Sequence, residues 1–247
     1  MPIGTAIAFA SGKGGVGKST ISAGVAEALA RKGYRTLAVD ADLFNRSLDL
    51  YIGADSGGVY DLGDVLENRC TLEDAICKSD FCGNLWYLPA TIGHDNIEPI
   101  IPYFEIILNK LKCNFDYIIF DIAAGLGKAF KFFTRFADIT CVVTTLQRSS
   151  IRDAERASEL LLNKKAYIVV NMVNPADIVN NLAPNIDDIM DMTGLPLIGI
   201  LPVEGRLQAW QNKGSSAFEL KNSAIVTEFN DIAHRLCGER RLQNKFW

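Results

Sequence analysis

The sequence predicts an α/β protein with a doubly wound, mostly parallel sheet flanked by helices. Short continuous runs of apolar and β-branched residues alternate with longer segments whose apolar residues recur at helical spacing. Apolar runs without polar alternation are typical of strands buried on both faces, as in a parallel sheet. Two of these runs end in a carboxylate, Asp40 and Asp121, at the strand end where α/β sheets bind ligands.

The expected strands and helices follow one another along the whole chain. The runs that predict strands are residues 5–10, 36–40, 85–88, 117–121, 139–144, 166–170 and 197–201. The segments that predict helices are residues 21–32, 97–111, 150–162, 185–192 and 223–237. Prolines are expected to interrupt the second helix, and Gly33 to stop the first. No repeat or linker divides the pattern, so one domain over residues 1–237 and a short tail over 238–247 are expected.

Length and composition narrow the class of protein. The 247 residues suffice for one large core, and 49% of them are apolar, as in a globular protein. A net charge of −4 argues against a generic nucleic-acid surface, although a local basic patch remains open. The start of the chain lacks the features of a signal peptide, and no apolar run reaches membrane-spanning length. A cytoplasmic protein is expected.

The cysteines and histidines do not form a pattern that predicts a metal site. Cys113 and Cys141 lie beside or within expected strands and are predicted to be small core residues. Cys77 and Cys82 leave open a metal or cluster site, but their spacing favours reduced structural thiols. His94 and His234 have no obvious partners in the sequence, so they are expected to be structural or surface residues.

Residues 11–20 have the pattern of a phosphate-binding loop between an expected strand and an expected helix. From Gly12 they fit G-x-x-x-x-G-K-[ST], which ends with Lys18 and Ser19. Glycines let backbone N–H groups turn around a phosphate, and the following helix directs its dipole at the same anion. Lys18 then supplies charge to the β- and γ-phosphates, and the Ser19 hydroxyl holds Mg²⁺. The residues expected to contact ATP here are Gly12, Lys13, Gly14, Gly15, Val16, Gly17, Lys18, Ser19 and Thr20.

A second lysine inside the loop, Lys13, makes the loop similar to the deviant Walker A loop of the MinD/ParA family of P-loop ATPases. The resemblance implies a P-loop fold, ATP and Mg²⁺ as ligands, an ATP-dependent homodimer, and hydrolysis to ADP and phosphate. In that family the additional lysine reaches the ATP held by the partner protomer. By resemblance, that role falls on Lys13.

Three aspartates are expected to complete the catalytic site. Asp121 ends an expected strand at the Walker B position, where a carboxylate supports Mg²⁺ directly or through water. The small residues 123–125 that follow suit a loop that responds to the γ-phosphate. Residues 39–49 resemble the first switch of the family, which implies that Asp42 contacts Mg²⁺ and orients the attacking water while Asp40 supports it. Lys18, Mg²⁺ and Lys13 of the partner protomer would neutralise the developing charge.

The adenine pocket is expected from the same resemblance. Asn171 follows a late strand, and Pro202, Val203 and Glu204 form the turn after the last strand, as in the family pattern. An asparagine side chain can pair with the edge of adenine, and proline offers a flat apolar wall. Because the guanine-specific motif is absent, ATP is favoured over GTP.

Within the family the motifs are most similar to those of the MinD branch, which selects the cell division site. Residues 149–156 resemble a segment near the dimer interface of that branch, where partner proteins bind. The resemblance implies a dimer or partner surface that contains Lys13, Ser150, Arg152 and Asp153. Either Ser149 or Ser150 is expected to cap the helix that starts there. The branch usually has asparagine where this chain has Ser47, which weakens any contact across the dimer from that position.

The last ten residues leave two interpretations open. Basic residues interleaved with Leu242, Phe246 and Trp247 suit a short helix that lies on a membrane surface when the protein holds ATP. A polar chain end with a terminal aromatic residue packed on the body fits equally well, because so short a helix is marginal alone.

Three alternatives share most of these motifs. A flagellar-number regulator (FlhG/FleN type) usually has an N-terminal extension that is absent from this sequence. A ParA-type partition ATPase binds DNA and requires a basic patch, whereas nucleic acid is not expected as a partner here. A non-hydrolysing, nucleotide-bound scaffold for metal or cofactor insertion would show no turnover even with every partner present.

Overall fold

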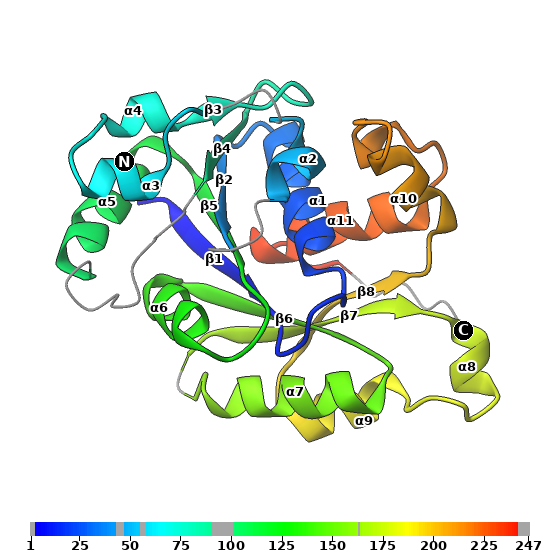
Figure 1. Cartoon of the computed structure of the whole chain (residues 1–247). Coiled ribbons are helices and arrows are strands. Elements are labelled where there is room, and N and C mark those ends of the chain that lie inside the picture. Colours follow the sequence, from blue (N-terminus) through cyan, green and yellow to red (C-terminus); the bar gives the residue numbers. More distant parts are fainter. Residues whose placement is uncertain (1–2, 43–46, 55–57, 90–100, 163, 242–247) are drawn as a thin grey trace.

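A central sheet organises the computed structural model, which describes residues 3–42, 47–54, 58–89, 101–162 and 164–241 (Figure 1). In this part of the chain the sheet has the strand order β3-β4-β2-β5-β1-β6-β7-β8. The strands are β1 (Thr5–Ala10), β2 (Thr36–Ala41), β3 (Cys77–Lys78), β4 (Leu85–Pro89), β5 (Tyr117–Ile122), β6 (Ile139–Thr145), β7 (Ala166–Val173) and β8 (Leu197–Pro202). Only β3 runs antiparallel to its neighbour among these pairs. The predicted doubly wound, mostly parallel sheet is confirmed.

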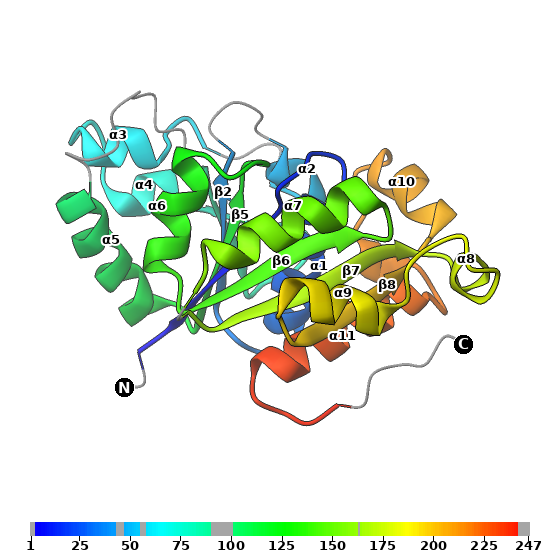
Figure 2. The same cartoon turned by 90° about the horizontal axis from the view of Figure 1, so that it is seen from below.

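Helices cover both faces of the sheet (Figures 1 and 2). One face of the sheet is covered by α1 (Lys18–Arg31), α2 (Leu48–Ile52), α10 (Gly205–Gln211) and α11 (Ala224–Leu236). The opposite face carries α3 (Leu62–Leu66), α4 (Leu72–Ala75), α5 (Ile101–Asn114), α6 (Lys128–Phe136), α7 (Arg148–Glu159) and α9 (Ile186–Thr193). The short α8 (Pro175–Val179) follows β7, and a 3-10 helix, η2 (Ala217–Glu219), precedes α11.

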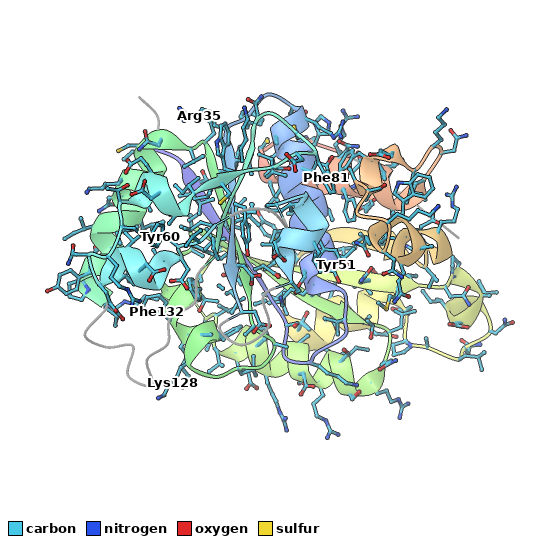
Figure 3. The ribbon with its side chains drawn as sticks, turned by 45° about the horizontal axis from the view of Figure 1, so that its top comes forward. Arg35, Tyr51, Tyr60, Phe81, Lys128 and Phe132 are labelled. Atoms are coloured by element: carbon cyan, nitrogen blue, oxygen red, sulfur yellow. The ribbon has the colours of Figure 1, made fainter. Side chains whose placement is uncertain are left out.

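Burial on both faces explains why the strands appear in the sequence as unbroken apolar runs. Along β1, Ala6 and Ala8 face one core layer, while Ile7 and Phe9 face the other. Side chains therefore fill the space on either side of the sheet (Figure 3). Successive residues of a strand point to opposite faces, so each position of a central strand must be apolar when both faces are covered.

One predicted helix boundary is confirmed and two other predictions about helices are wrong. α1 ends at Arg31 and Gly33 has a φ of 96°, as the glycine stop predicts. α5 continues through Pro102 because proline is tolerated in the first turn of a helix, so the predicted interruption is wrong there. α7 starts at Arg148 with Gln147 at the capping position. The prediction that Ser149 or Ser150 caps this helix is therefore wrong.

The cysteines occupy mixed environments. Cys141 is buried in β6 as predicted, and burial raises the pKa of its thiol to about 12. The prediction for Cys113 is wrong, because it lies on the solvent-facing side of α5 and is exposed. Cys77 lies in β3, and Cys77 and Cys82 are both half-buried. Across the described part of the chain, no helix combines the length and apolar character needed to cross a membrane.

Candidate nucleotide-binding site

The predicted phosphate loop connects the carboxyl end of β1 to the first turn of α1. Gly15 and Gly17 have φ angles of 79° and 82°, a left-handed conformation that glycine adopts without strain. No side chain caps α1, so the N–H groups of its first turn point toward the loop and can bind an anion. The Asn171 side-chain amide, in β7, donates to the carbonyl oxygen of Val16 at 2.7 Å and so ties the loop to the sheet. This arrangement fits a phosphate group.

A buried ion pair lies under the loop. Lys18 Nζ is 2.6 Å from Asp121 Oδ1, and the two side chains are 8% and 1% exposed. Lys18 Nζ also donates to Ser19 Oγ at 3.3 Å. Asp121 lies in β5, which pairs directly with β1, so the loop lysine and the strand carboxylate meet across adjacent elements. The hydroxyl and the carboxylate are oxygen donors of the kind that Mg²⁺ prefers.

The oxygen donors at the site fit Mg²⁺ better than a metal ion whose ligands are all protein side chains. Within the described ranges, no group of three or more His, Cys, Asp or Glu side chains could enclose a metal ion. Mg²⁺ keeps several waters and uses one or two carboxylates together with substrate phosphates. Ser19, Asp42 and Asp121 all lie at the same end of the sheet, beside the phosphate loop.

Asp40 holds the backbone of the segment that follows β2. Its Oδ1 accepts from the Asp42 N–H, and its Oδ2 accepts from the N–H groups of Ser47 and Leu48, each at 3.1 Å. Asp40 is 1% exposed, and burial raises the pKa of its carboxyl from 3.8 to about 6, aided by the charge of Asp121 in the next strand. Its carboxylate is thus engaged by backbone donors, which is the geometry of a positioning residue.

Replacing Asp40 by asparagine should flatten the pH dependence of the unfolding free energy between about pH 4 and 6. A carboxyl whose folded-state pKa is raised binds its proton more tightly in the folded protein. The stability it contributes is therefore complete below its unfolded pKa of 3.8 and is lost as the pH rises through about 6. The shift corresponds to about 3 kcal/mol at most. Urea unfolding of both proteins across this range measures the difference, and parallel pH profiles would place the titrating group elsewhere.

Asp42 lies just beyond β2 and is half-exposed, at the edge of the sheet where β5 ends one residue after Asp121. Residues 43–46, which belong to the expected first switch, lie outside the described residues. Ser47 precedes α2 without capping it through its side chain. The position of Asp42 at the carboxyl end of β2, next to the phosphate loop, is compatible with its expected role toward Mg²⁺ and water.

The second lysine of the loop contacts α7 of its own chain. Lys13 Nζ donates to Ser149 Oγ at 3.1 Å and to Gln147 Oε1 at 3.5 Å. Gly12 packs against the same helix, because a Cβ at this position would lie 2.6 Å from Asp153 Cβ and 2.8 Å from the Asp153 carbonyl oxygen. The absence of a side chain at Gly12 is what allows the phosphate loop to approach α7 so closely.

The predicted partner surface on α7 is only partly exposed. Arg152 is exposed and Asp153 is half-buried beneath the phosphate loop. Ser150 is only 3% exposed, so its assignment to a surface is wrong. It lies on the helix face that carries Ile151 and Ala154 into the core, and helical geometry directs that face away from solvent.

The loop after β5 also contacts the phosphate loop. The Gly125 N–H donates to the Ser11 carbonyl oxygen at 2.8 Å, and Gly125 has a φ of 104°. Ser11 Oγ donates to the Lys13 carbonyl oxygen at 2.9 Å. The phosphate loop therefore touches both α7 and the loop that is expected to respond to the γ-phosphate.

The expected adenine residues lie together at the carboxyl ends of β7 and β8. Asn171 is buried against the phosphate loop, whereas Val203 is 63% exposed next to Pro202. Glu204 caps α10, and both of its oxygens are engaged by Arg206. These hydrogen bonds lower the pKa of Glu204 to about 2. Its carboxylate therefore shapes the turn.

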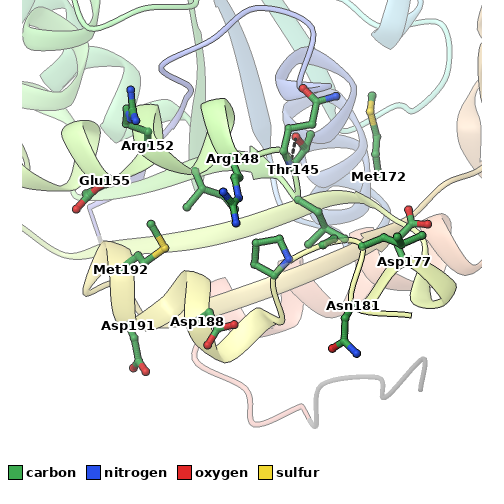
Figure 4. Close-up of a pocket in the computed structure, with 16 residues that line it drawn as sticks. Thr145, Arg148, Arg152, Glu155, Met172, Asp177, Asn181, Asp188, Asp191 and Met192 are labelled. Atoms are coloured by element: carbon green, nitrogen blue, oxygen red, sulfur yellow. Dashed lines mark hydrogen bonds between the residues drawn. The ribbon is translucent and has the colours of Figure 1, made fainter. Parts of the chain in front are cut away.

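A groove of about 1340 Å³ lies beside the site, between α7, α8 and α9 (Figure 4). One wall carries Arg148 and Arg152 from α7, and the other carries Asp177, Asp188 and Asp191 from α8 and α9. The sequence does not reveal this groove, because its residues come from three separate helices. The acidic positions of α9 alone are typical of a solvated helix face.

The fold and the site together define a P-loop nucleoside triphosphatase. Residues 7–217 match the family model described as the CobQ/CobB/MinD/ParA nucleotide binding domain. The chain belongs to the MinD/ParA family of P-loop ATPases, as its resemblance to that family predicts.

Relatives and solved structures agree with this assignment. The septum site-determining protein MinD of Synechocystis is 37% identical over 94% of this chain and 89% of that protein. The Bacillus subtilis protein of the same name is 35% identical over 96% of this chain and 90% of its own length. The Aquifex aeolicus MinC:MinD complex contains a chain 34% identical with a TM-score of 0.87, covering 97% of this chain and 100% of that one. MinD of Pyrococcus horikoshii, solved with Mg-ADP, is 26% identical with a TM-score of 0.80, covering 95% of this chain and 96% of that one.

Proposed function

We propose that this protein is a Mg-ATP-dependent switch of the MinD type that takes part in placing the cell division site. It dimerises when it holds ATP, hydrolyses ATP to ADP and phosphate, and then separates. The observation that carries this proposal is the direct contact of the phosphate loop with α7 through Gly12 and Lys13. That contact links nucleotide binding to an exposed helix, which a positioning switch requires. Two relatives that are 37% and 35% identical to this chain, both named septum site-determining protein MinD, support the proposal.

The chemistry assigned to the site is in-line attack of water on the γ-phosphorus. A bond forms between the water oxygen and phosphorus, the bond to the β-γ bridging oxygen breaks, and ADP leaves. Asp42 orients the water, while Lys18 exchanges its partner Asp121 for phosphate oxygens and neutralises their charge. Ser19, Asp42 and Asp121 would hold Mg²⁺, which would supply positive charge at the phosphates. Lys13 of the second protomer completes the charge neutralisation.

We also propose roles for the residues near the base and for the C-terminal tail. Asn171, Pro202 and Val203 line the adenine site, with Glu204 holding the turn through Arg206. Residues 1–237 act as one ATPase domain. Residues 238–247 form a tail that attaches the ATP-bound dimer to the inner face of the cell membrane. Its proposed anchor residues Leu242, Phe246 and Trp247 lie outside the described residues.

An activating or cargo protein is proposed to bind at the exposed part of α7. Arg152 lines the groove, and Asp153 beside it packs against Gly12 of the phosphate loop, where a partner would sense the nucleotide. The Aquifex aeolicus relative is solved as a MinC:MinD complex, which supports a protein partner for the family. The charged walls of the groove suit a partner with both acidic and basic side chains.

Replacing Asp42 by alanine should leave ATP binding and the ATP-dependent dimer intact while lowering hydrolysis by at least about a hundredfold. The reason is that Asp42 acts on the water, whereas the phosphate loop and Lys18 hold the nucleotide. Phosphate release and light-scattering mass with ATP and with ADP measure the two effects. Asp80→Ala, which removes an exposed carboxylate between β3 and β4, is the matched control. Wild-type turnover in Asp42→Ala would exclude Asp42 from the mechanism. If the wild-type protein and both variants stay monomeric with ATP, the proposed ATP-dependent switch is overturned.

A further inference from the structure

The end of β7 contains a bulge next to the phosphate loop. Its register with β8 shifts between Val170 and Val173, so Asn171 and Met172 stand opposite the single residue Leu201. Val170 and Val173 are three positions apart, yet both face the core layer beneath α7, whereas strict alternation would put them on opposite faces. The bulge therefore leaves Met172 outside the alternation of the strand. Bulges redirect side chains in this way and are common beside active sites.

Met172 has a backbone conformation that a long side chain disfavours. Its φ is 55°, and in the part of the chain that the structure describes the other non-glycine residues with a positive φ are all asparagines. Asparagine visits the left-handed region readily, whereas methionine is strained there. Met172 is also 47% exposed, so burial in the core does not account for this conformation. Backbone strain of this kind is concentrated at ligand sites, where the surrounding structure maintains it.

The side chain of Met172 reaches the end of the phosphate loop. A Cβ at Gly17 would lie 3.6 Å from Met172 Cε and 2.2 Å from Asn171 Nδ2. In Figure 4 the side chain of Met172 extends beside the ribbon of α1. Asn171 is only 5% exposed, and its amide donates to the Val16 carbonyl oxygen. Met172 therefore supplies the exposed apolar surface at this end of β7.

A nucleotide whose phosphates occupy the loop must cross this surface. The first turn of α1 points toward the phosphates, and the base is proposed to lie against Pro202 and Val203 after β8. β7 and β8 are neighbours in the sheet, and the Val203 N–H donates to the Val173 carbonyl oxygen at 3.3 Å. Met172 thus lies between Gly17 and the turn after β8, on the course that the sugar and the base would follow.

We propose that Met172 is a further base-binding residue of the nucleotide site, and that its thioether packs against the face of the adenine ring. This inference rests on the proposed adenine site at Pro202 and Val203 and adds to it the residue that covers the ring. Methionine sulfur is polarizable and makes favourable contacts with aromatic rings. The bulge fixes the backbone of Met172 in advance, so less conformational freedom is lost when the base binds.

The first test is the methyl resonance of Met172 in protein labelled with carbon-13 at its methionine methyl groups. The signal that disappears in Met172→Leu assigns this resonance. Saturating Mg-ADP should move it upfield, because the ring current of a base shields a methyl group that lies over its face. Mg-pyrophosphate fills the loop without a base and should leave the resonance near its free position. The methyl group of Met192, 49% exposed on the opposite wall of the groove, is the internal control and should not move.

Calorimetric titration with Mg-ADP gives the second readout. Met172→Gly removes the side chain and adopts a positive φ without strain, so the variant should remain folded. It should bind Mg-ADP about tenfold more weakly, which corresponds to about 50 Å² of apolar area no longer buried against the base. Met172→Leu keeps an apolar side chain of similar volume and should bind within about threefold of wild type. Met192→Ala is the matched control and should bind as wild type.

The two readouts separate contact with the base from support of the backbone. An upfield shift with Mg-ADP alone, together with weaker binding by Met172→Gly, establishes the contact. If the resonance stays in place, or moves equally with Mg-pyrophosphate, Met172 does not cover the ring and the inference is overturned. Binding of Mg-ADP by Met172→Gly as tight as that of wild type overturns it as well. Failure of the wild-type protein to bind Mg-ADP would overturn the proposed function and this inference together, whereas tight binding with an unmoved resonance overturns the inference alone.

Discussion

Lys18→Met should strongly lower ATP hydrolysis and also destabilise the fold, the largest combined effect expected for any single substitution in this chain. The charge of Lys18 serves the phosphates, so its loss should lower turnover by about a hundredfold to a thousandfold. In the protein itself, the same charge compensates Asp121, which is 1% exposed and 2.6 Å away. Removing one member of a buried pair leaves an uncompensated charge, which costs about 3–5 kcal/mol. Phosphate release and urea unfolding measure the two losses.

A second variant separates the two effects. Lys18→Met/Asp121→Asn removes both charges, so it should recover most of the unfolding free energy while remaining inactive. Arg69→Met is the exposed control, because Arg69 is 58% exposed where it pairs with Asp64 at 2.8 Å, and its loss should cost less than about 1 kcal/mol. If Lys18→Met is as stable as wild type, the Lys18–Asp121 pair does not contribute to the fold in solution.

The phosphate loop could be predicted because its chemistry is local. Ten consecutive residues carry the glycines, Lys18 and Ser19, and the order of strand, loop and helix confirms their context. The buried strands could be predicted for the same reason, since burial on both faces requires an apolar residue at every position. Short elements such as β3 and α4 could not, because they contain too few residues for any periodicity to appear.

Contacts between distant segments could not be predicted from the sequence. The family pattern placed Asn171 and Glu204 near a base, but it did not show that their polar atoms hold the Val16 carbonyl and Arg206. Ser150 was misassigned because similarity along the chain does not reveal which face of a helix a residue occupies. Both cases have one cause, which is that tertiary packing sets the hydrogen-bond partners and the burial of a side chain.

Lys13→Ala should lower ATP hydrolysis by about a thousandfold and prevent the ATP-dependent dimer, if Lys13 acts on the ATP of the partner protomer. The structure gives Lys13 two neutral partners at the surface, Ser149 and Gln147. Exposed hydrogen bonds of this kind contribute about 1 kcal/mol or less, so Lys13 can leave them at little cost when a phosphate becomes available. Ser149→Ala removes one of these contacts alone and should change turnover by less than about threefold.

Mixing two inactive variants decides whether Lys13 acts within its own chain or across the dimer. In a dimer of Lys13→Ala with Asp42→Ala, the first protomer keeps Asp42 and receives Lys13 from the second. That site is complete only if Lys13 acts across the interface. Each mixed dimer should then hydrolyse ATP at about half of the wild-type rate, because one of its two sites is complete. If Lys13 acts on the ATP of its own protomer, both sites of the mixed dimer are incomplete. A mixture that forms mixed dimers but stays inactive would therefore show that Lys13 acts within its own chain.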